Sequence, residues 1–168
     1  MAAQRNPKDQ IIEGAIAHLD TQGPPFASYA NIADAADLSR QLMRNKEYKK
    51  AYALASQHHL LEGSSFADLE WLSGYLALRF LNDPAKALAH FQAHQGAVVT
   101  PISRGRAGYW IGRTQEALGS SKAAKASYAD GAEYQSSFYG LLAAERGGLA
   151  FDQSLAGKGA LPDWRQAS

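Results

Sequence analysis

The sequence contains no cysteine. This absence excludes disulfide bonds, thiol catalysis and cysteine-based zinc sites at once, and it leaves the cellular compartment open. The chain has 168 residues, of which 46% are hydrophobic and 20% are charged. A chain of this length and composition can fold around one ordinary apolar core without such cross-links, so we expect a single globular unit at its centre.

A surplus of charge is also missing, because 17 Lys and Arg residues stand against 16 Asp and Glu residues. Strong nonspecific binding to nucleic acid or to an anionic membrane depends on excess positive charge, so we expect neither. The sequence has no glycine-rich phosphate loop, no nucleophile elbow and no carboxylate pair of recognisable spacing. We therefore expect no cofactor, and no catalysis from this chain alone.

Long hydrophobic runs are absent as well. No stretch approaches the roughly 20 apolar residues that cross a bilayer, so no membrane span is expected. The first five residues, Met-Ala-Ala-Gln-Arg, lead into polar sequence without the apolar run of a secretion signal. Either the protein stays inside the cell, or a signal has been removed from it.

Helical periodicity is the signal that recurs most often along the chain. Apolar residues fall at helix-like spacings in seven segments, and caps and breakers separate these segments. Asp83-Pro84 and Thr100-Pro101 each join an N-cap residue to a proline that suits the first helical position. The expected helices cover residues 33–45, 47–58, 66–80, 84–95, 102–118, 121–134 and 137–146.

Two of these helices carry further predictions. The helix over residues 66–80 has apolar residues on both faces and should be deeply buried, with Ser64 or Ser65 as its cap. Gly96 should end the next helix. Strand signals are almost absent, because the apolar stretch 97–99 is too short to count.

The two ends of the chain differ from its centre. Residues 8–20 have the pattern of one helix, which Gly-Pro-Pro at 23–25 must break. From residue 149 onward, glycines and a proline indicate an irregular tail, held by Phe151 or Trp164. We therefore divide the chain into an N-terminal helix and linker (1–30), a helical repeat domain (31–148) and a tail (149–168).

An internal repeat links the expected helices. Three alanines, 36 and 37 residues apart, occupy the same place in successive second helices, and four residues after each stands its packing partner. This spacing is close to the 34-residue tetratricopeptide period. The alanines are Ala51, Ala87 and Ala124, and their partners are Ala55, Phe91 and Tyr128. Chance alignment of alanine-rich helices is the competing explanation.

Glycines and a tryptophan fit the same repeat in part. Trp71 and Gly112 stand where the repeat places its tryptophan and its close-packing glycine, whereas the glycine of the middle repeat is displaced to Gly74. A small residue lets two antiparallel helices approach closely, and a bulky partner fills the gap one turn away. The sequence therefore predicts an all-α fold, a tetratricopeptide-like superhelix of antiparallel helical hairpins.

Histidines offer the only pattern with metal-ligand spacing. His90 and His94, at i and i+4, could present two nitrogens to one metal, but a catalytic zinc helix would carry Glu where Phe91 stands. His58 and His59 point in different directions on a helix and are weaker still. We expect no metal site and interpret the first pair as polar positions on a wet helix face.

Arginine and aromatic residues gather near the start of the helix expected over residues 102–118. Arginines beside aromatic faces can bind acidic groups or stack on sugars. The alternative is that these aromatics are buried and that the arginines form structural ion pairs, as is usual around Trp and Tyr in cores. The candidate contact residues are Arg104, Arg106, Tyr109, Trp110 and Arg113.

Three segments carry a family resemblance. Residues 68–79 (DLEWLSGYLALR), 100–113 (TPISRGRAGYWIGR) and 137–145 (SFYGLLAAE) are similar to the helical region of soluble lytic murein transglycosylases from proteobacteria. The likeness covers about residues 46–148. In that family the helical region lies just upstream of the catalytic domain.

This resemblance implies a function. The helical part of the family forms a curved superhelix or ring, and a separate lysozyme-like domain cleaves the glycan strand with a single glutamate to give a 1,6-anhydromuramyl product. Its catalytic blocks, Glu-Ser, Gly-Leu-Met-Gln and Ala-Tyr-Asn-Ala-Gly, do not occur in this sequence. The resemblance therefore implies a non-catalytic domain that acts in the periplasm, after loss of a signal, with peptidoglycan glycan strands as its partner.

A second hypothesis comes from a different class of protein. A helical-repeat scaffold of this kind can bind a protein segment in its groove without any enzyme attached. The natural gene discriminates between the two hypotheses. A stop codon after Ser168 supports the scaffold, and continuation into the catalytic blocks supports the transglycosylase.

Overall fold

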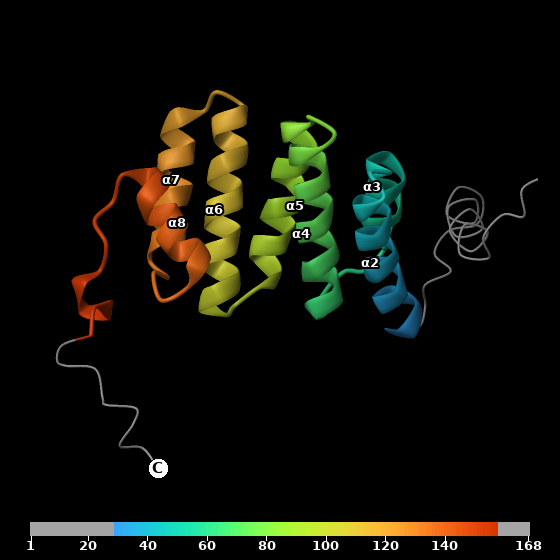
Figure 1. The fold of residues 1–168 in the computed structure, drawn as a ribbon, viewed down its shortest axis with the longest axis horizontal. Helices are drawn as coiled ribbons and strands as arrows, with labels where there is room; N and C mark the ends of the chain where they lie inside the picture. The colour runs from blue at the N-terminus through green and yellow to red at the C-terminus, as the bar shows by residue number, and fades with distance from the viewer. Residues whose placement is uncertain (1–28, 158–168) are drawn as a thin grey trace, which may run out of the picture.

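A computed structural model describes residues 29–157 of the chain, with side chains from residue 35 onward (Figure 1). Its regular structure within that range is entirely helical, which confirms the all-α prediction. The helix expected over residues 8–20, and Trp164 in the tail, lie outside the described residues. The elements are α2 (Tyr29–Arg44), α3 (Tyr48–Ser56), α4 (Gly63–Arg79), α5 (Pro84–Ala97), α6 (Pro101–Ala117), α7 (Ser121–Ala132), α8 (Phe138–Gly147) and a short 3-10 helix, η1 (Gln153–Leu155).

The helices form antiparallel hairpins that stack in chain order. The pairs α2–α3, α4–α5 and α6–α7 each make one hairpin, and α8 packs on α6 and α7 (Figure 1). The buried apolar residues form two clusters, one around the first hairpin and most of α4, and the other from Ala77 near the end of α4 through α8. Tyr52 and Trp71 pack against both clusters and so join them into one core.

Side-chain caps set the starts of α5, α6 and α8. The side chain of Asp83 accepts a hydrogen bond from the Lys86 N–H at 3.0 Å, and that of Thr100 accepts one from the Ser103 N–H. Each is followed by proline at the first helical position, as predicted. Ser137 caps α8 in the same way. These caps confirm three of the expected starts to within a residue.

Three expected boundaries are wrong. The first of these is the start of α2, which begins at Tyr29 and not at residue 33. Neither Ser64 nor Ser65 caps α4, because Gly63 already lies in the helix and Glu62 is its N-cap. Gly63 has φ of 95°, a conformation that glycine adopts without strain, so the chain enters the helix earlier than the serines suggest. Gly96 does not end α5, which continues to Ala97. An interior glycine costs a helix only about 1 kcal/mol relative to alanine, too little to stop it.

The turn inside each hairpin repeats its backbone conformation. Lys46, Asn82 and Gly119 have φ of 65°, 53° and 75°, and they are 36 and 37 residues apart in the sequence. These separations equal those of the three alanines, each of which stands five residues after one of the left-handed residues. A matching turn geometry at the same period shows that the repeat is structural and not a chance alignment of alanines.

The repeat positions are also the points of closest packing. Ala51 and Ala87 are fully buried and Ala124 is 2% exposed. A Cβ on Gly112 would lie 2.5 Å from the Tyr128 ring, and a Cβ on Gly74 would lie 2.8 Å from the Phe91 ring. Gly74, the displaced glycine of the middle repeat, therefore has the same role as Gly112. Each glycine allows a bulky side chain of the second helix to pack closely against the first helix.

Candidate functional site

Aromatic side chains tie the first helices of neighbouring hairpins together. The Trp71 and Tyr75 rings of α4 stack at 5.4 Å, and both meet the Trp110 ring of α6 edge-on, at 6.3 and 5.2 Å. The Tyr139 ring of α8 lies 6.4 Å from that of Trp110. We call this surface the arginine–aromatic face and define it by Trp71, Tyr75, Arg106, Tyr109, Trp110, Arg113 and Tyr139.

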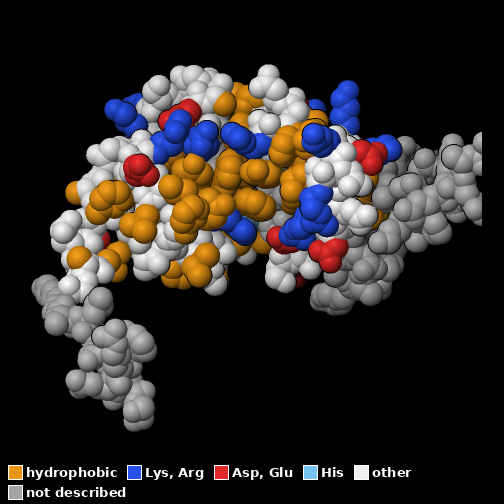
Figure 2. All heavy atoms as spheres, in the orientation of Figure 1, with side chains coloured by type: hydrophobic (Ala, Val, Ile, Leu, Met, Phe, Trp, Pro, Cys, Tyr) orange, Lys and Arg blue, Asp and Glu red, His pale blue; other side chains and the backbone are white. Residues whose placement is uncertain are grey.

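The predicted aromatic residues form the floor of this face. Tyr109 is 9% exposed and Trp110 is 8% exposed, so both rings are mostly covered by their neighbours. Trp71, Tyr75 and Tyr139 are half-buried and offer more ring surface to solvent. In the view of Figure 2, hydrophobic side chains gather over the middle of the row of helices, and Lys and Arg side chains border them.

Sequence reasoning missed these three more accessible rings as site residues. A signal for two of them was present, because Trp71 and Tyr75 are four residues apart and therefore share one side of a helix. No sequence pattern indicates that Trp71 and Tyr75 lie near the arginines of α6, because this placement depends on how α4 packs relative to α6.

Arg106 is the most unusual charged group on the face. Its guanidinium carbon lies 4.7 Å from the centroid of the Trp71 ring, within the range of a cation–π contact. Burial lowers the pKa of Arg106, and the charge of Asp68 acts in the opposite direction. The Asp68 carboxylate, however, accepts its hydrogen bond from Arg40. Within residues 35–157, Arg106 forms no ion pair.

The seam between α4 and α6 is also short of hydrogen-bond acceptors. Arg106 Nε and the indole nitrogens of Trp71 and Trp110 have no hydrogen-bond partner among the described residues. Buried donors without partners are uncommon in proteins, and partly buried charges are usually paired. Those three nitrogens are covered by protein, but Arg106 as a whole is only half-buried and has no ion pair among the described residues, so its guanidinium suits a carboxylate supplied by a ligand.

The other two arginines differ from Arg106. Arg113 donates from Nη1 to the Tyr109 hydroxyl at 2.9 Å, and its Nε lies 3.6 Å from Glu116. Its side chain is therefore occupied by internal partners, as the structural alternative expects. Arg104 is half-buried and forms no ion pair with the part of the chain that the structure describes. The structure thus brings Arg106 together with three candidate residues and leaves Arg104 at the start of α6.

A second polar cluster joins the first two hairpins. The Glu70 carboxylate accepts hydrogen bonds from His58 Nε2 at 2.9 Å and from His90 Nδ1 at 2.7 Å, and His90 Nε2 lies 3.0 Å from the Tyr52 hydroxyl. Burial alone would raise the pKa of Glu70, but the two histidine hydrogen bonds outweigh it and lower this pKa to about 2. The Leu60 N–H donates to His58 Nδ1, which fixes Nε2 as the protonated nitrogen of a neutral ring.

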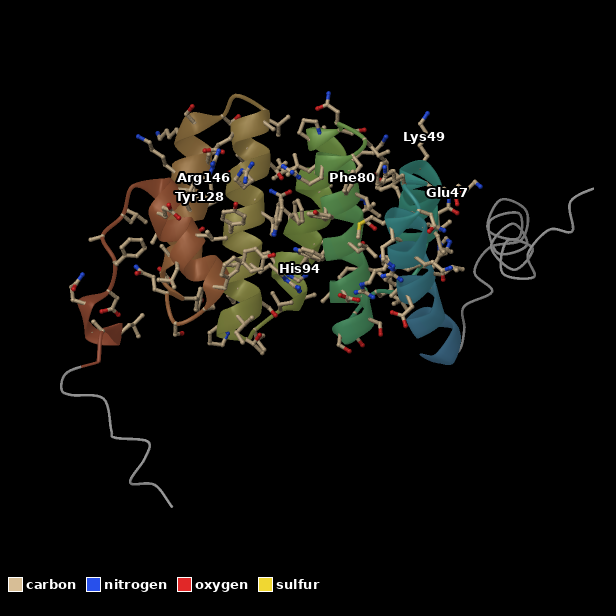
Figure 3. All side chains as sticks on the ribbon, viewed as in Figure 1. Glu47, Lys49, Phe80, His94, Tyr128 and Arg146 are labelled. Carbon is tan, nitrogen blue, oxygen red and sulfur yellow. The ribbon has the colours of Figure 1, made fainter. Side chains whose placement is uncertain are left out.

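The histidines of α5 do not lie on a wet face, and that prediction is wrong. His94 is fully buried (Figure 3), and its Nδ1 donates to the Ala67 carbonyl at 2.7 Å. Burial lowers the pKa of His94, which favours the neutral ring. His90 faces Glu70 across the hairpin instead of solvent. Among the described residues, no three His, Asp or Glu side chains are grouped as a metal site requires.

Comparisons with known proteins add no relative. No protein-family model, curated protein or solved structure matches the chain. The resemblance to lytic transglycosylases therefore stays a prediction that depends on the three segments quoted above. Within residues 29–157, none of the helices combines the length and apolarity needed to cross a membrane.

Proposed function

We propose that this chain is a non-catalytic α-superhelical domain of a lytic murein transglycosylase, and that it holds peptidoglycan glycan strands in the periplasm for a separate catalytic domain. Two observations support the proposal. Residues 68–79, 100–113 and 137–145 are similar to that family's helical region. The fold is a stack of helical hairpins, an architecture that offers extended binding surfaces.

The unpaired Arg106 guanidinium over Trp71 is the observation that carries the proposal. Peptidoglycan offers the two kinds of group that this arrangement suits. Its sugar rings have apolar faces that stack on aromatic side chains such as Tyr75 and Tyr139, and its peptide stems carry carboxylates that pair with arginine. The segments that carry the resemblance are also those that supply these side chains.

Purified murein provides the test. We expect the double variant Arg104→Ala/Arg106→Ala to bind sedimented murein sacculi at least about tenfold more weakly than wild type, because it loses the charge-assisted contact of Arg106 and the nearby positive charge of Arg104 on the same helix. Lys122→Ala/Lys125→Ala is the matched control, since it removes two exposed positive charges from α7 and should bind as wild type does. Circular dichroism would confirm that both variants fold. A double variant that bound murein as well as wild type would rule out both arginines as contacts for the glycan strand.

A protein-binding scaffold remains the second candidate, and a specific cavity favours it. This cavity lies at the turns of the first two hairpins and borders the arginine–aromatic face, since its Phe80 ring meets the Tyr75 ring edge-on at 5.7 Å. The two candidates differ in their ligand and in the residues that bind it. Release of anhydro-muropeptides by the isolated chain would contradict both, because neither gives it a catalytic site.

A further inference from the structure

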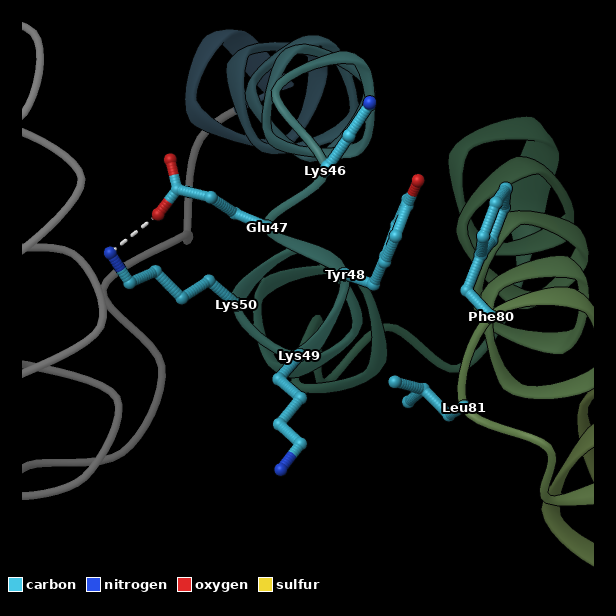
Figure 4. Close-up of a pocket in the computed structure, with 7 residues that line it drawn as sticks. All are labelled: Lys46, Glu47, Tyr48, Lys49, Lys50, Phe80 and Leu81. Carbon is cyan, nitrogen blue, oxygen red and sulfur yellow. Dashed lines mark hydrogen bonds and ion pairs between the residues drawn. The ribbon is translucent and has the colours of Figure 1, made fainter.

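A cavity of about 440 Å³ opens where the α2–α3 turn meets the α4–α5 turn (Figure 4). The Tyr48 and Phe80 rings stack there at 4.1 Å, with only 11° between their planes. Phe80 is 37% exposed, although large aromatic side chains are usually covered. The cavity is lined by Lys46, Glu47, Tyr48, Lys49, Lys50, Phe80 and Leu81.

The rim of this cavity is basic. Residues 44–50 include four basic side chains and one acidic side chain, and that acid, Glu47, already pairs with Lys50 at 2.6 Å. Lys46 and Lys49 are exposed and form no ion pair with any residue that the structure describes. Figure 4 shows their side chains extending to either side of Tyr48. The cavity therefore combines an aromatic wall with two uncompensated cations.

The backbone at Lys46 provides a way to test the charge alone. Lys46 has φ of 65° at the end of α2, a conformation that favours glycine, and Gly119 occupies the same position of the third hairpin. Replacing Lys46 with glycine therefore removes the charge and relieves backbone strain in one step. Such a variant is expected to fold at least as well as wild type.

We propose that this cavity binds an acidic peptide segment. One apolar side chain of the segment packs against Tyr48, Phe80 and Leu81, and neighbouring carboxylates pair with Lys46 and Lys49. A peptide segment suits the site, because the cavity volume lies within the roughly 300–1,000 Å³ typical of ligand sites. The two sites share no residue, because the proposed glycan binding uses the arginine–aromatic face, which meets the cavity only where the Tyr75 ring contacts the Phe80 ring.

The test uses the full chain and a fluorescein-labelled peptide, Asp-Glu-Phe-Asp-Glu, followed by fluorescence anisotropy. We expect saturable binding that weakens with added salt, because two ion pairs contribute to it. Lys46→Gly/Lys49→Gln should bind this peptide at least about tenfold more weakly, which corresponds to the loss of two charge-assisted contacts. Lys122→Gln/Lys125→Gln on α7 is the control with the same charge change and should bind as wild type does.

Additional binding measurements distinguish an acidic peptide from other ligands of the cavity. The peptide Lys-Lys-Phe-Lys-Lys should not bind, and the Lys46→Gly/Lys49→Gln variant should keep wild-type affinity for murein. The proposal is overturned if wild type shows no saturable peptide binding, or if the cavity variant binds as tightly as the α7 control. Binding to phosphatidylglycerol vesicles without binding to the acidic peptide would also overturn it, in favour of a lipid surface.

Discussion

Replacing Glu70 with alanine is expected to lower the free energy of unfolding by about 3 kcal/mol, because two histidine N–H donors lose their acceptor at a cost of about 1–3 kcal/mol each. The variant leaves the His58 and His90 nitrogens without their acceptor in the contact between the first two hairpins. Urea denaturation at pH 7, followed by circular dichroism, measures this loss.

Two further variants make the Glu70 result specific. Glu70→Gln keeps the side-chain volume and one acceptor oxygen, so it should lose less stability than Glu70→Ala. Glu145→Ala removes an exposed glutamate from α8 and should change the free energy of unfolding by no more than about 0.5 kcal/mol. Equal stability of Glu70→Ala and Glu145→Ala would mean that the histidine–glutamate cluster does not hold the hairpins together.

The same carboxylate gives the stability a defined pH dependence. The pKa of Glu70 is about 2 in the folded protein, whereas an ordinary glutamate has a pKa of 4.5. Since the folded state holds the carboxylate ionised, its stabilising contribution is fully present above pH 4.5 and is lost as the pH falls towards 2. The difference in unfolding free energy between wild type and Glu70→Gln should therefore shrink on acidification below pH 4.5. A difference that stayed constant there would contradict the assignment.

Replacing Gly108 with alanine is the second large expected effect. A Cβ on Gly108 would lie 2.5 Å from the Cα and 2.6 Å from the N of Gly131, so α6 and α7 would have to move apart. Backbone atoms yield less easily than side chains, and we expect a loss of about 3 kcal/mol, the upper end of the range for overpacking. The melting temperature and the urea midpoint should both fall.

Gly96 offers a matched control in the same protein. It lies inside α5, and a Cβ added there would meet nothing within 4 Å. Gly96→Ala should therefore raise the free energy of unfolding, by up to about 1 kcal/mol, because alanine favours the helix over glycine. If Gly96→Ala and Gly108→Ala had the same effect, close backbone packing would not be what holds α6 against α7.

The fold could be predicted in most of its outline because its signals are local. Asp83-Pro84 and Thr100-Pro101 cap their helices through atoms only three residues away, and the alanine spacing is visible in the sequence itself. The predicted cap at Ser64 is wrong for a local reason as well. Serine is a common N-cap, but α4 already begins at Gly63, one residue before it. The helix-forming preferences of the residues thus predict where the helices lie. The backbone conformation of Gly63 places the start of α4 before the serines.

The polar sites were harder to predict because their partners are distant in the chain. His94 bonds to a carbonyl 27 residues away, and His90 bonds to a carboxylate 20 residues away, so their burial leaves no mark on the periodicity of α5. Arg106 was named from its own segment, but its place over Trp71 follows from the packing of α4 on α6. The basic cavity likewise exists only because two turns of different hairpins meet.

Residue-resolved mapping of glycan binding tests the central claim most directly. Purified peptidoglycan strands would be titrated into isotope-labelled protein, and the amide, indole and guanidinium signals would be followed by NMR. The proposed function predicts that the perturbed signals cluster on the arginine–aromatic face, with Arg106 Nε, Trp71 and Tyr139 among them, and that α3, α5 and α7 stay unchanged. Absence of any perturbation, or perturbations confined to those second helices, would contradict it.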